Sequence, residues 1–420
     1  MRVLMWHGWL LEGSGSNVYT ARVADVLRRW GHDVLLICQE RHADRYDFLD
    51  AWGTVGPDGV SPLTALPRPH RLGRGILLRP DIGTLLPVFV IDEYEGFDVM
   101  RFPELNHREL SAYLDRNVAA LRAAVSWFNP DVVIAGHAVP GAVIAARALG
   151  SGSYTAKIHG SDLEYAIRLQ PRYRRLAREG LDGAGAVAGP TADVLARTVE
   201  LVPSVAGKTR VVPPGVDVEA FRPMPRRAAF ERTAAGLRSD PDTVRGRPPE
   251  LDQFVREAVE HREAQVLDDL AHRYDQSVPD RDAAERLLSL AAYEGPLVGY
   301  LGKLIPQKGV ELFLAALPRL RADARALVVG FGLFREWLAA FLHCLDRSDA
   351  AGLTWLSHAS DLTVDLPPGP SGLAGGLGSR VTFTGRLDHR YAPGVLAALD
   401  VLVVPSVLDE AFGMVAAEGA

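Results

Sequence analysis

The residues best suited to chemistry lie between residues 410 and 420, where Glu410 and Glu418 bracket a short apolar stretch that contains Gly413. An apolar run precedes them at residues 400–406, so the pattern predicts a strand, a Pro-Ser turn and a helix. A glycine lets backbone N–H groups approach a ligand closely, and a helix N-terminus favours an anion such as a diphosphate. These residue types indicate a site for a polar ligand. The alternative is two glutamates on a solvated helix face.

Two lysines form the second candidate group, directly after a strand predicted at residues 296–301. Lys303 and Lys308 flank a turn that begins at Gly302 and leads into a predicted helix. Cations in this place stabilise negative charge that builds on a departing phosphate, and the helix N-terminus adds to the effect. Taken alone, the segment is equally a pair of surface lysines. The glutamates strengthen the functional interpretation, because both segments would lie at strand carboxyl ends of one domain.

The first half of the chain contains two further candidates. Residues 13–17, Gly-Ser-Gly-Ser-Asn, precede a predicted helix. They are not a dinucleotide fingerprint, because Val18 stands where that motif needs its last glycine. Gly15 and Ser16 therefore belong either to an ordinary strand-to-helix turn or to a ligand-binding loop. His159 follows a predicted strand, where its imidazole either contacts a ligand or serves the structure alone.

The elements that must position these residues alternate between strand and helix. The first half contains predicted strands at residues 2–6, 33–38, 131–135, 154–158, 184–188 and 209–212, and predicted helices at residues 18–27, 108–128 and 140–149. The second half contains predicted strands at residues 296–301, 326–329, 381–384 and 401–404, and predicted helices at residues 309–320 and 333–345. Alternation of this kind builds parallel sheets that are covered by helices.

Between these halves, residues 226–294 are rich in Arg, Asp and Glu and show helical periodicity at residues 251–274 and 283–293. We therefore predict an α/β fold with two doubly wound, Rossmann-like domains that face a cleft, at residues 1–223 and 295–420. A charged helical insertion is predicted at residues 224–294, with its charges on solvated helix faces. Ligands of doubly wound sheets bind at the carboxyl ends of the strands.

Composition narrows the function classes. The 420 residues are enough for two or three domains, and 48% hydrophobic with 23% charged residues indicates a globular protein. A net charge of −6 argues against broad nucleic-acid binding. Two cysteines, Cys38 and Cys344, cannot form a disulfide framework or a zinc site by themselves, so a reducing cytoplasm is the expected location.

Several of these segments resemble one enzyme family. The spacing of Glu410 and Glu418 resembles the Glu-x7-Glu motif of the retaining glycosyltransferases of family 4, which have the GT-B architecture. Residues 302–309 resemble that family's Gly-Arg-Leu…Lys-Gly step, and residues 212–223 resemble its linker between the two domains. The His-Gly-Ser-Asp run at His159 is similar to the family's His-Gly-Thr-Asp step.

Further segments extend the resemblance over most of the chain except residues 226–294 and the middle of the first half. Residues 13–17 resemble the family's glycine-rich loop, which faces the donor phosphate and the acceptor. Residues 383–387 resemble the segment whose backbone lies against the nucleotide base. Two positions depart from the family pattern. Lys303 stands where Arg is usual, so a point charge replaces a bidentate fork, and Phe331 replaces a common Asp.

The resemblance implies that the second domain binds a nucleotide-diphosphate sugar and that an unidentified acceptor approaches from the first, with no metal ion and no cofactor. In that reaction Lys303 and Lys308 stabilise the leaving diphosphate, and Glu410 orients the sugar. Glu418 contacts the ribose, and His159 contacts the sugar near the reacting carbon. The other donor-binding residues implied in the same way are Gly15, Ser16, Gly302, Arg386, Leu387, Phe412, Gly413 and Met414.

Three other functions remain as alternatives. A glycoside hydrolase would use Glu410 and Glu418 as acid and nucleophile, but eight helical residues separate them by roughly 12 Å along the axis. Paired glycosidase carboxylates lie about 5–9.5 Å apart. A nucleotide-sugar epimerase of the same fold would need no acceptor. A non-catalytic nucleotide-sugar-binding protein would bind the donor without transfer or hydrolysis.

Two expectations concern the surface and the end of the chain. The basic run at residues 172–178 is expected on a solvated helix face, with weak contact to an anionic acceptor or membrane surface as the alternative. About four strands precede Ala420 in the second domain, fewer than the usual five or six of a sheet. The sequence is therefore expected to be a C-terminally truncated form, with Glu418 on a fraying terminus.

Overall fold

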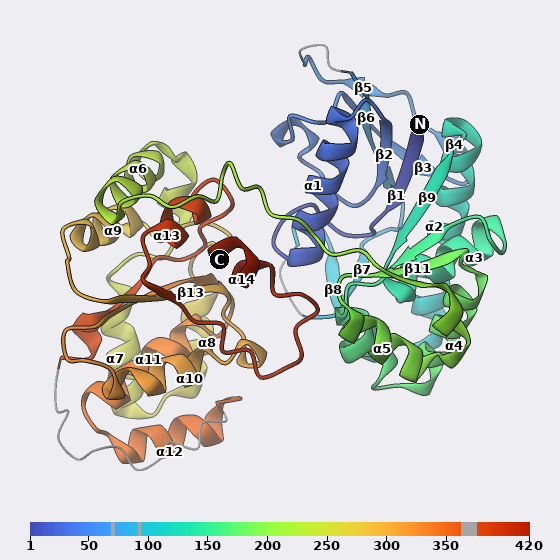
Figure 1. Ribbon diagram of the computed structural model, residues 1–420. Helices are drawn as coiled ribbons and strands as arrows, with labels where there is room; N and C mark the ends of the chain where they lie inside the picture. Colours follow the sequence, from blue (N-terminus) through green and yellow to red (C-terminus); the bar gives the residue numbers. More distant parts are fainter. Residues whose placement is uncertain (69–71, 91–93, 363–375) are drawn as a thin grey trace. The chain divides into compact units, whose positions relative to one another are not determined.

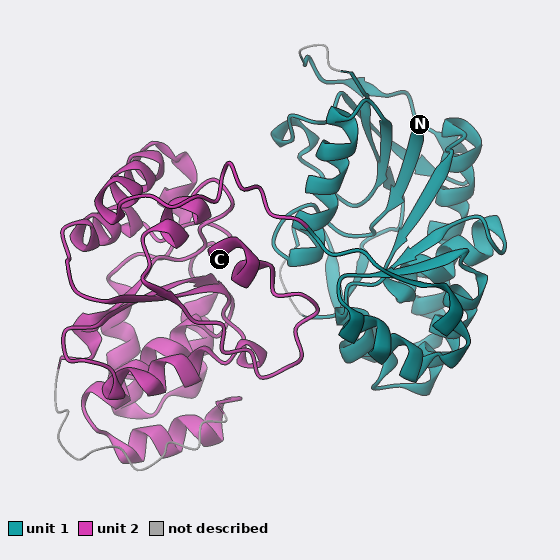
Figure 2. Cartoon of the chain, viewed as in Figure 1, with its two compact units in different colours: residues 1–214 teal, residues 215–420 magenta. Residues whose placement is uncertain are grey.

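The computed structural model describes residues 1–68, 72–90, 94–362 and 376–420, which form two compact units. Unit 1 spans Met1–Pro214 and unit 2 spans Gly215–Ala420 (Figures 1 and 2). Each unit contains a parallel sheet with helices packed on it, so the predicted pair of doubly wound α/β domains is confirmed. The change of unit at residue 214 falls nine residues before the predicted boundary.

The first unit is organised around one large sheet. Its strands are, in spatial order, β12 (Thr209–Val211), β11 (Ala186–Gly189), β10 (Thr155–Lys157), β9 (Val132–Gly136), β1 (Arg2–Trp6), β2 (Asp33–Ile37), β6 (Gly75–Pro80), β3 (Ala51–Gly56) and β4 (Gly59–Val60), with β5 (Thr64–Ala65) paired to β3. Its α-helices are α1 (Gly15–Arg29), α2 (His107–Phe128), α3 (Val143–Leu149), α4 (Pro171–Gly183) and α5 (Ala192–Leu201). β7 (Leu85–Val88) and β8 (Asp98–Arg101) form a separate pair.

Local signals set the ends of the first helix. The Ser14 side chain caps α1 by accepting from the backbone N–H of Asn17, which satisfies one of the first-turn donors. Gly31 stops the helix with φ +85°, a left-handed conformation that glycine adopts without strain. Ala21 and Ala24 then pack on strand residues that share one face of the sheet, including Val3, Met5, Val34 and Leu36.

Residues 39–107 contain strands that the sequence pattern did not predict. β4 and β5 have two residues each, and β5 is fully exposed, so neither shows a run of alternating apolar residues. The helix predicted at residues 140–149 also differs in the structure. The backbone at His137–Ala142 is kinked rather than regularly helical, because Val139 has extended φ/ψ angles and Pro140 cannot donate a backbone hydrogen bond, and α3 begins only at Val143.

The second unit has a smaller sheet. Among the described residues its strands are, in spatial order, β15 (Val381–Phe383), β14 (Arg325–Phe331), β13 (Leu297–Lys303) and β16 (Val401–Leu402). Its α-helices are α6 (Arg226–Ser239), α7 (Leu251–His261), α8 (Ala264–Ala271), α9 (Ala283–Ala291), α10 (Val310–Ala316), α11 (Arg335–Asp346), α12 (Ala350–Ala359), α13 (Ala392–Ala397) and α14 (Met414–Gly419).

Alternate side chains of the two central strands face opposite layers of helices. Leu297 and Leu327 pack in a cluster with residues of α6, α9 and α13. Val298 and Val328 pack in a second cluster with residues of α7, α8, α10 and α11. Since successive strand residues point to opposite faces, both faces of the sheet are buried, as expected for a parallel sheet.

The predicted helical insertion forms α6–α9, which belong to unit 2 and cover both faces of its sheet (Figure 1). The single helix expected at residues 251–274 is two helices, because Arg262 adopts a left-handed conformation with φ +59° between α7 and α8. Within the described part of the chain, we find no helix whose length and apolar character would allow it to cross a membrane.

Candidate functional site

The loops after β13 and β16 lie side by side because these strands are parallel neighbours in the second sheet. The backbone N–H of Val407 donates to the carbonyl of Gln307 at 3.1 Å, which links the two loops. Gly309 has φ +62°, and a Cβ atom added there would lie 2.3 Å from the carbonyl oxygen of Pro405. Only glycine permits this close approach without rearrangement.

The contact between the loops joins two residues that the sequence placed in different motifs. Lys308 Nζ forms an ion pair with Glu410 Oε1. The hydroxyl of Ser406 donates to the same carboxylate oxygen. Both charged side chains are one-third exposed, so a ligand can reach them. The arrangement places a cation and a carboxylate together at the carboxyl-terminal edge of the sheet, where doubly wound folds bind ligands.

Glu418 lies in α14, a short helix that starts after Gly413, whose φ is +76°. Its carboxylate contacts Nε2 of His389 at 3.0 Å, and only 6% of its side chain is exposed. The His389 ring in turn makes an edge contact with Phe221. In this structure the Glu418 carboxylate is therefore held by packing and by a hydrogen bond, rather than pointing freely into solvent.

Phe331 lies between two of the predicted donor-binding residues. Lys303 Nζ lies 5.4 Å from the centre of the Phe331 ring, and Arg386 Cζ lies 5.1 Å from it. The Arg386 guanidinium also donates to the carbonyl of Ser277 at 3.2 Å. Both cations therefore lie within the range of a cation–π contact with this ring. The sequence offered one sign of this role, the Phe that replaces the family's Asp.

The remaining predicted residues of unit 2 lie in the sheet, in the core or beside Gly413. Gly302 pairs with Gly330 on the neighbouring strand. The side chain of Leu387 is 5% exposed and packs in the core beside α6 and α9, so any role of this residue in ligand binding falls to its backbone. Phe412 and Met414 are partly buried next to Gly413.

His159 follows β10 in the first unit and lies in a group of aromatic rings. Its ring centre is 4.5 Å from that of His137 and 5.5 Å from that of Tyr19. Burial, with added repulsion from His7 and Lys157, lowers the pKa of His159 well below its usual value. At neutral pH this imidazole is therefore uncharged, with one nitrogen able to donate and the other to accept a hydrogen bond.

The glycine-rich loop is fixed by a buried histidine. His7 Nε2 contacts Oδ1 of Asn17 at 2.8 Å, and His7 Nδ1 contacts the hydroxyl of Thr20 at 3.2 Å. Gly15 and Ser16 form the first turn of α1, where backbone N–H groups have no partner inside the helix. These contacts position the start of α1, so the N–H groups of Gly15 and Ser16 are available to an anion.

His137 and Asp162 are two further buried polar residues of unit 1, besides His7. Neither nitrogen of His137 hydrogen-bonds to any described residue, and its φ is +70°. Asp162 accepts from the backbone N–H of Ala138, and burial raises its pKa to about 6. Among the residues that the structure describes, no group of three or more His, Cys, Asp or Glu side chains is arranged to hold a metal ion.

Sequence comparisons match the chain to glycosyltransferases. Residues 14–215 match a family model described as a glycosyl transferase 4-like domain. A glycogen synthase from Halorhodospira halophila is 48% identical over 54 residues, which are 13% of this chain and 11% of that protein. A 2-deoxystreptamine N-acetyl-D-glucosaminyltransferase from Streptomyces fradiae is 32% identical over 138 residues, which are 31% of this chain and 26% of that protein.

Structural comparisons identify the fold. A sucrose-phosphate synthase from Thermosynechococcus elongatus matches with a TM-score of 0.54 and 16% identity, over all of this chain and 78% of that one. The HepE protein from Anabaena, solved in complex with UDP-glucose, matches with a TM-score of 0.52 and 14% identity, over all of this chain and 78% of that one. At these identities the likeness establishes the GT-B fold.

Proposed function

Because the chain carries a glycosyl transferase 4-like domain and has the GT-B fold, we propose that it is a retaining glycosyltransferase that moves a sugar from a nucleotide-diphosphate sugar to an acceptor. The ion pair between Lys308 and Glu410 is the observation that carries this proposal. It joins the predicted diphosphate clamp to the predicted sugar-binding carboxylate in one place. The UDP-glucose complex of the Anabaena protein supports the same class of donor.

Binding of the donor to unit 2 would use the cations around the carboxyl-terminal sheet edge. Lys308 would leave Glu410 for the diphosphate, and Lys303 and Arg386, held near Phe331, would add positive charge. The freed carboxylate of Glu410 would accept hydrogen bonds from sugar hydroxyls. Glu418 would contact the ribose hydroxyls in exchange for His389. Charge-assisted hydrogen bonds of this kind are among the stronger contacts that a site can offer.

The reaction exchanges one bond at the anomeric carbon for another. The bond from that carbon to the diphosphate breaks, and the diphosphate keeps the electron pair. The acceptor oxygen bonds to the same face of the sugar, and the proton of the acceptor hydroxyl passes to an oxygen of the departing diphosphate. Lys303 and Lys308 stabilise the charge that grows on the departing group, so no metal ion is required. His159, uncharged at neutral pH, would hydrogen-bond a sugar hydroxyl near the reacting carbon.

The test is product analysis with the full chain, a panel of UDP, GDP and ADP sugars, and an acceptor mixture. We expect nucleoside diphosphate release that depends on an acceptor, a product with the anomeric configuration of the donor, and equal activity in EDTA. Conversion of the donor into an epimer without an acceptor would identify an epimerase instead. Donor binding without transfer or hydrolysis would identify a binding protein, and an inverted product would remove the retaining assignment.

A further inference from the structure

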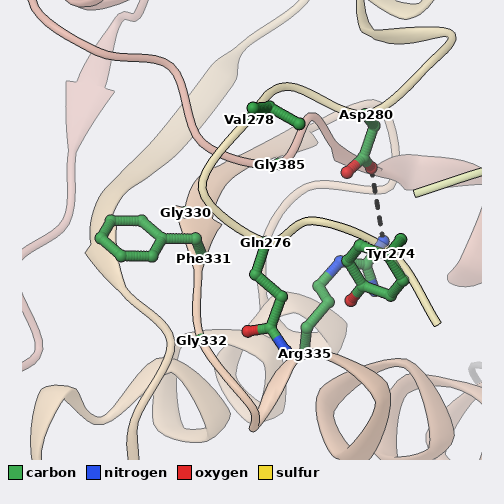
Figure 3. Close-up of a pocket in the computed structure, with 9 residues that line it drawn as sticks. All are labelled: Tyr274, Gln276, Val278, Asp280, Gly330, Phe331, Gly332, Arg335 and Gly385. Carbon is green, nitrogen blue, oxygen red and sulfur yellow. Dashed lines mark ion pairs between the residues drawn. The ribbon is translucent and has the colours of Figure 1, made fainter. Parts of the chain in front are cut away.

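A small pocket opens at the carboxyl end of β14, and three separate segments line it (Figure 3). The first is residues 274–280, the part of the helical insertion that leads into α9. The second is residues 330–335, from the end of β14 to the start of α11. The third is Gly385, directly after β15. The insertion, which the resemblance does not cover, therefore contributes one wall of a pocket at the ligand-binding edge of the sheet.

Arg335 supplies hydrogen-bond donors to this pocket. The residue is 4% exposed, and its Nε and Nη1 atoms hydrogen-bond to none of the described residues. Its guanidinium stacks at 3.8 Å on the Phe383 ring, and its Nη2 lies 3.9 Å from the Asp280 carboxylate, the contact drawn in Figure 3. Buried donors without a partner are costly, so their presence at a pocket indicates that a ligand supplies the acceptor.

The wall opposite Arg335 is built into the edge of the sheet. The backbone N–H of Asp280 donates to the carbonyl of Thr384 at 2.9 Å, and Pro279 forms a bridge with Gly385. A Cβ atom added at Gly385 would lie 2.5 Å from Asp280 Oδ1, so the missing side chain makes room for this carboxylate. Figure 3 shows Asp280 and Gln276 on the segment of residues 274–280 and Arg335 at the start of α11.

We propose that Arg335, Asp280 and Gln276 read the nucleobase of the donor and select a base that has a ring carbonyl beside a ring N–H. Uracil and guanine share this edge. The proposal rests on the proposed function. Arg335 would donate to the carbonyl oxygen, and Asp280 would accept from the ring N–H. Adenine presents an amino group where the others have the carbonyl, so it would turn N–H donors toward the Arg335 donors and leave them unpaired.

Calorimetric titration of the full chain with UDP, GDP and ADP tests the proposal. We expect UDP or GDP to bind at least about tenfold more tightly than ADP, since an unmatched buried hydrogen-bonding edge is discriminated this strongly or more. Comparing the affinities for UDP and GDP decides between uracil and guanine. In Arg335→Gln and in Gln276→Ala the preference over ADP should shrink by about tenfold or more. Arg238→Gln and Gln253→Ala, at exposed positions of the same insertion, should leave it unchanged.

Gln276→Ala removes only a partly buried amide, so it remains informative if Arg335→Gln does not fold. Tightest binding of ADP would overturn the base assignment. So would a preference for UDP or GDP that survives in both Gln276→Ala and a folded Arg335→Gln. Neither result touches the proposed function, which depends on acceptor-dependent transfer from a nucleotide sugar. A chain that transfers no sugar from any of the three donor classes would instead remove the proposed function.

Discussion

Lys308 and Glu410 lie 102 residues apart in the sequence and form an ion pair at the edge of the second sheet. The pairing follows from topology, because the parallel strands β13 and β16 bring their following loops together. Each charge offsets the other until a ligand separates them. A diphosphate would take the lysine and a sugar hydroxyl would take the carboxylate, so donor binding and this ion pair compete for the same atoms.

Replacing Lys308 by Ala should slow transfer in the full chain. We expect the rate constant to fall by about 10²-fold or more, because the lysine stabilises charge that grows as the diphosphate departs. The measurement is kcat at saturating donor. Arg321→Ala is the matched control, since this cation of unit 2 is exposed and pairs with Asp323 at the surface. Equal kcat in the Lys308→Ala and control variants would remove the diphosphate assignment.

Substitutions of the two glutamates should weaken the binding of different ligands. Glu418→Gln should weaken binding of the bare nucleoside diphosphate, and it should bind the 2′-deoxy analogue about as well as the parent nucleotide, because the ribose contact is already lost. Glu410→Gln should spare the bare nucleotide and weaken the sugar-bearing donor. Calorimetric titration of each variant measures both affinities. The division of roles is wrong if both variants lose the same affinity for the bare nucleotide.

A buried ion pair ties the insertion to helix α11 of unit 2. Arg247 and Glu336 are both fully buried and share two hydrogen bonds of 2.8 Å. Arg247→Ala leaves the carboxylate buried without its main partner, so unit 2 should lose about 3–5 kcal/mol of unfolding free energy. Urea unfolding measures the loss. Arg238→Ala, which removes an exposed pair with Glu285, should cost about 1 kcal/mol or less.

Two outcomes would show that the buried pair does not anchor the insertion. One is an equal, small effect of the Arg247→Ala and Arg238→Ala variants. The other is an Arg247→Ala variant in which the insertion and the rest of unit 2 still unfold together with the stability of the parent chain. Glu336→Gln added to Arg247→Ala should restore part of the loss, because no unpaired charge then remains buried.

Buried His7 should make the unfolding free energy of unit 1 depend on pH. Burial lowers the pKa of His7 from 6.5 to about 4 in the folded protein. The unfolded chain therefore binds more protons between these values, and the contribution of neutral His7 to stability is full above pH 6.5 and lost as pH falls toward 4. The destabilisation caused by His7→Gln should accordingly shrink by about 1.4 kcal/mol for each pH unit in that window. Urea unfolding from pH 7 to 4.5 measures it.

Exposed His107 on α2 is the control for this experiment. Because His107 is exposed, His107→Gln should cost less unfolding free energy at pH 7 than His7→Gln. A His7→Gln effect that stays constant from pH 7 to 4.5 would mean that His7 keeps its ordinary pKa in the folded state. Asp162 works in the opposite direction, because its raised pKa makes its contribution fall as pH rises to about 6. The parent chain and the single variants all contain Asp162, so its contribution cancels when their unfolding free energies are compared at the same pH.

Apolar periodicity and glycine signals predicted the two longest helices of unit 1, while the six-residue strands β3 and β6 were not predicted. The α2 helix appears at His107–Phe128 and ends where Asn129-Pro130 predicted, since Asn129 adopts a left-handed conformation. The short strands β4 and β5 were missed because two residues are too few to give a periodic pattern. The break at Arg262 was missed because arginine is an ordinary helix residue, and only tertiary packing explains its left-handed conformation.

Motif spacing suggested candidate residues for the site but not the contacts between them. Motif spacing selected Lys308, Glu410 and Glu418, while it did not indicate that Glu410 holds Lys308 or that His389 holds Glu418. These pairs depend on strand order, which the chain sets only when the sheet forms. The pocket beside Arg335 was not predicted, because the insertion, which the resemblance does not cover, supplies one of its walls.

The most direct test of the account is calorimetric titration of nucleotide sugars into the full chain and into Lys308→Ala, with Arg321→Ala as control. The account predicts saturable binding of at least one UDP, GDP or ADP sugar by the unaltered chain and by Arg321→Ala. It predicts binding at least about tenfold weaker in Lys308→Ala, since a charge-assisted contact to the diphosphate is lost. Unchanged affinity in Lys308→Ala, or no binding of any nucleotide sugar, would contradict it.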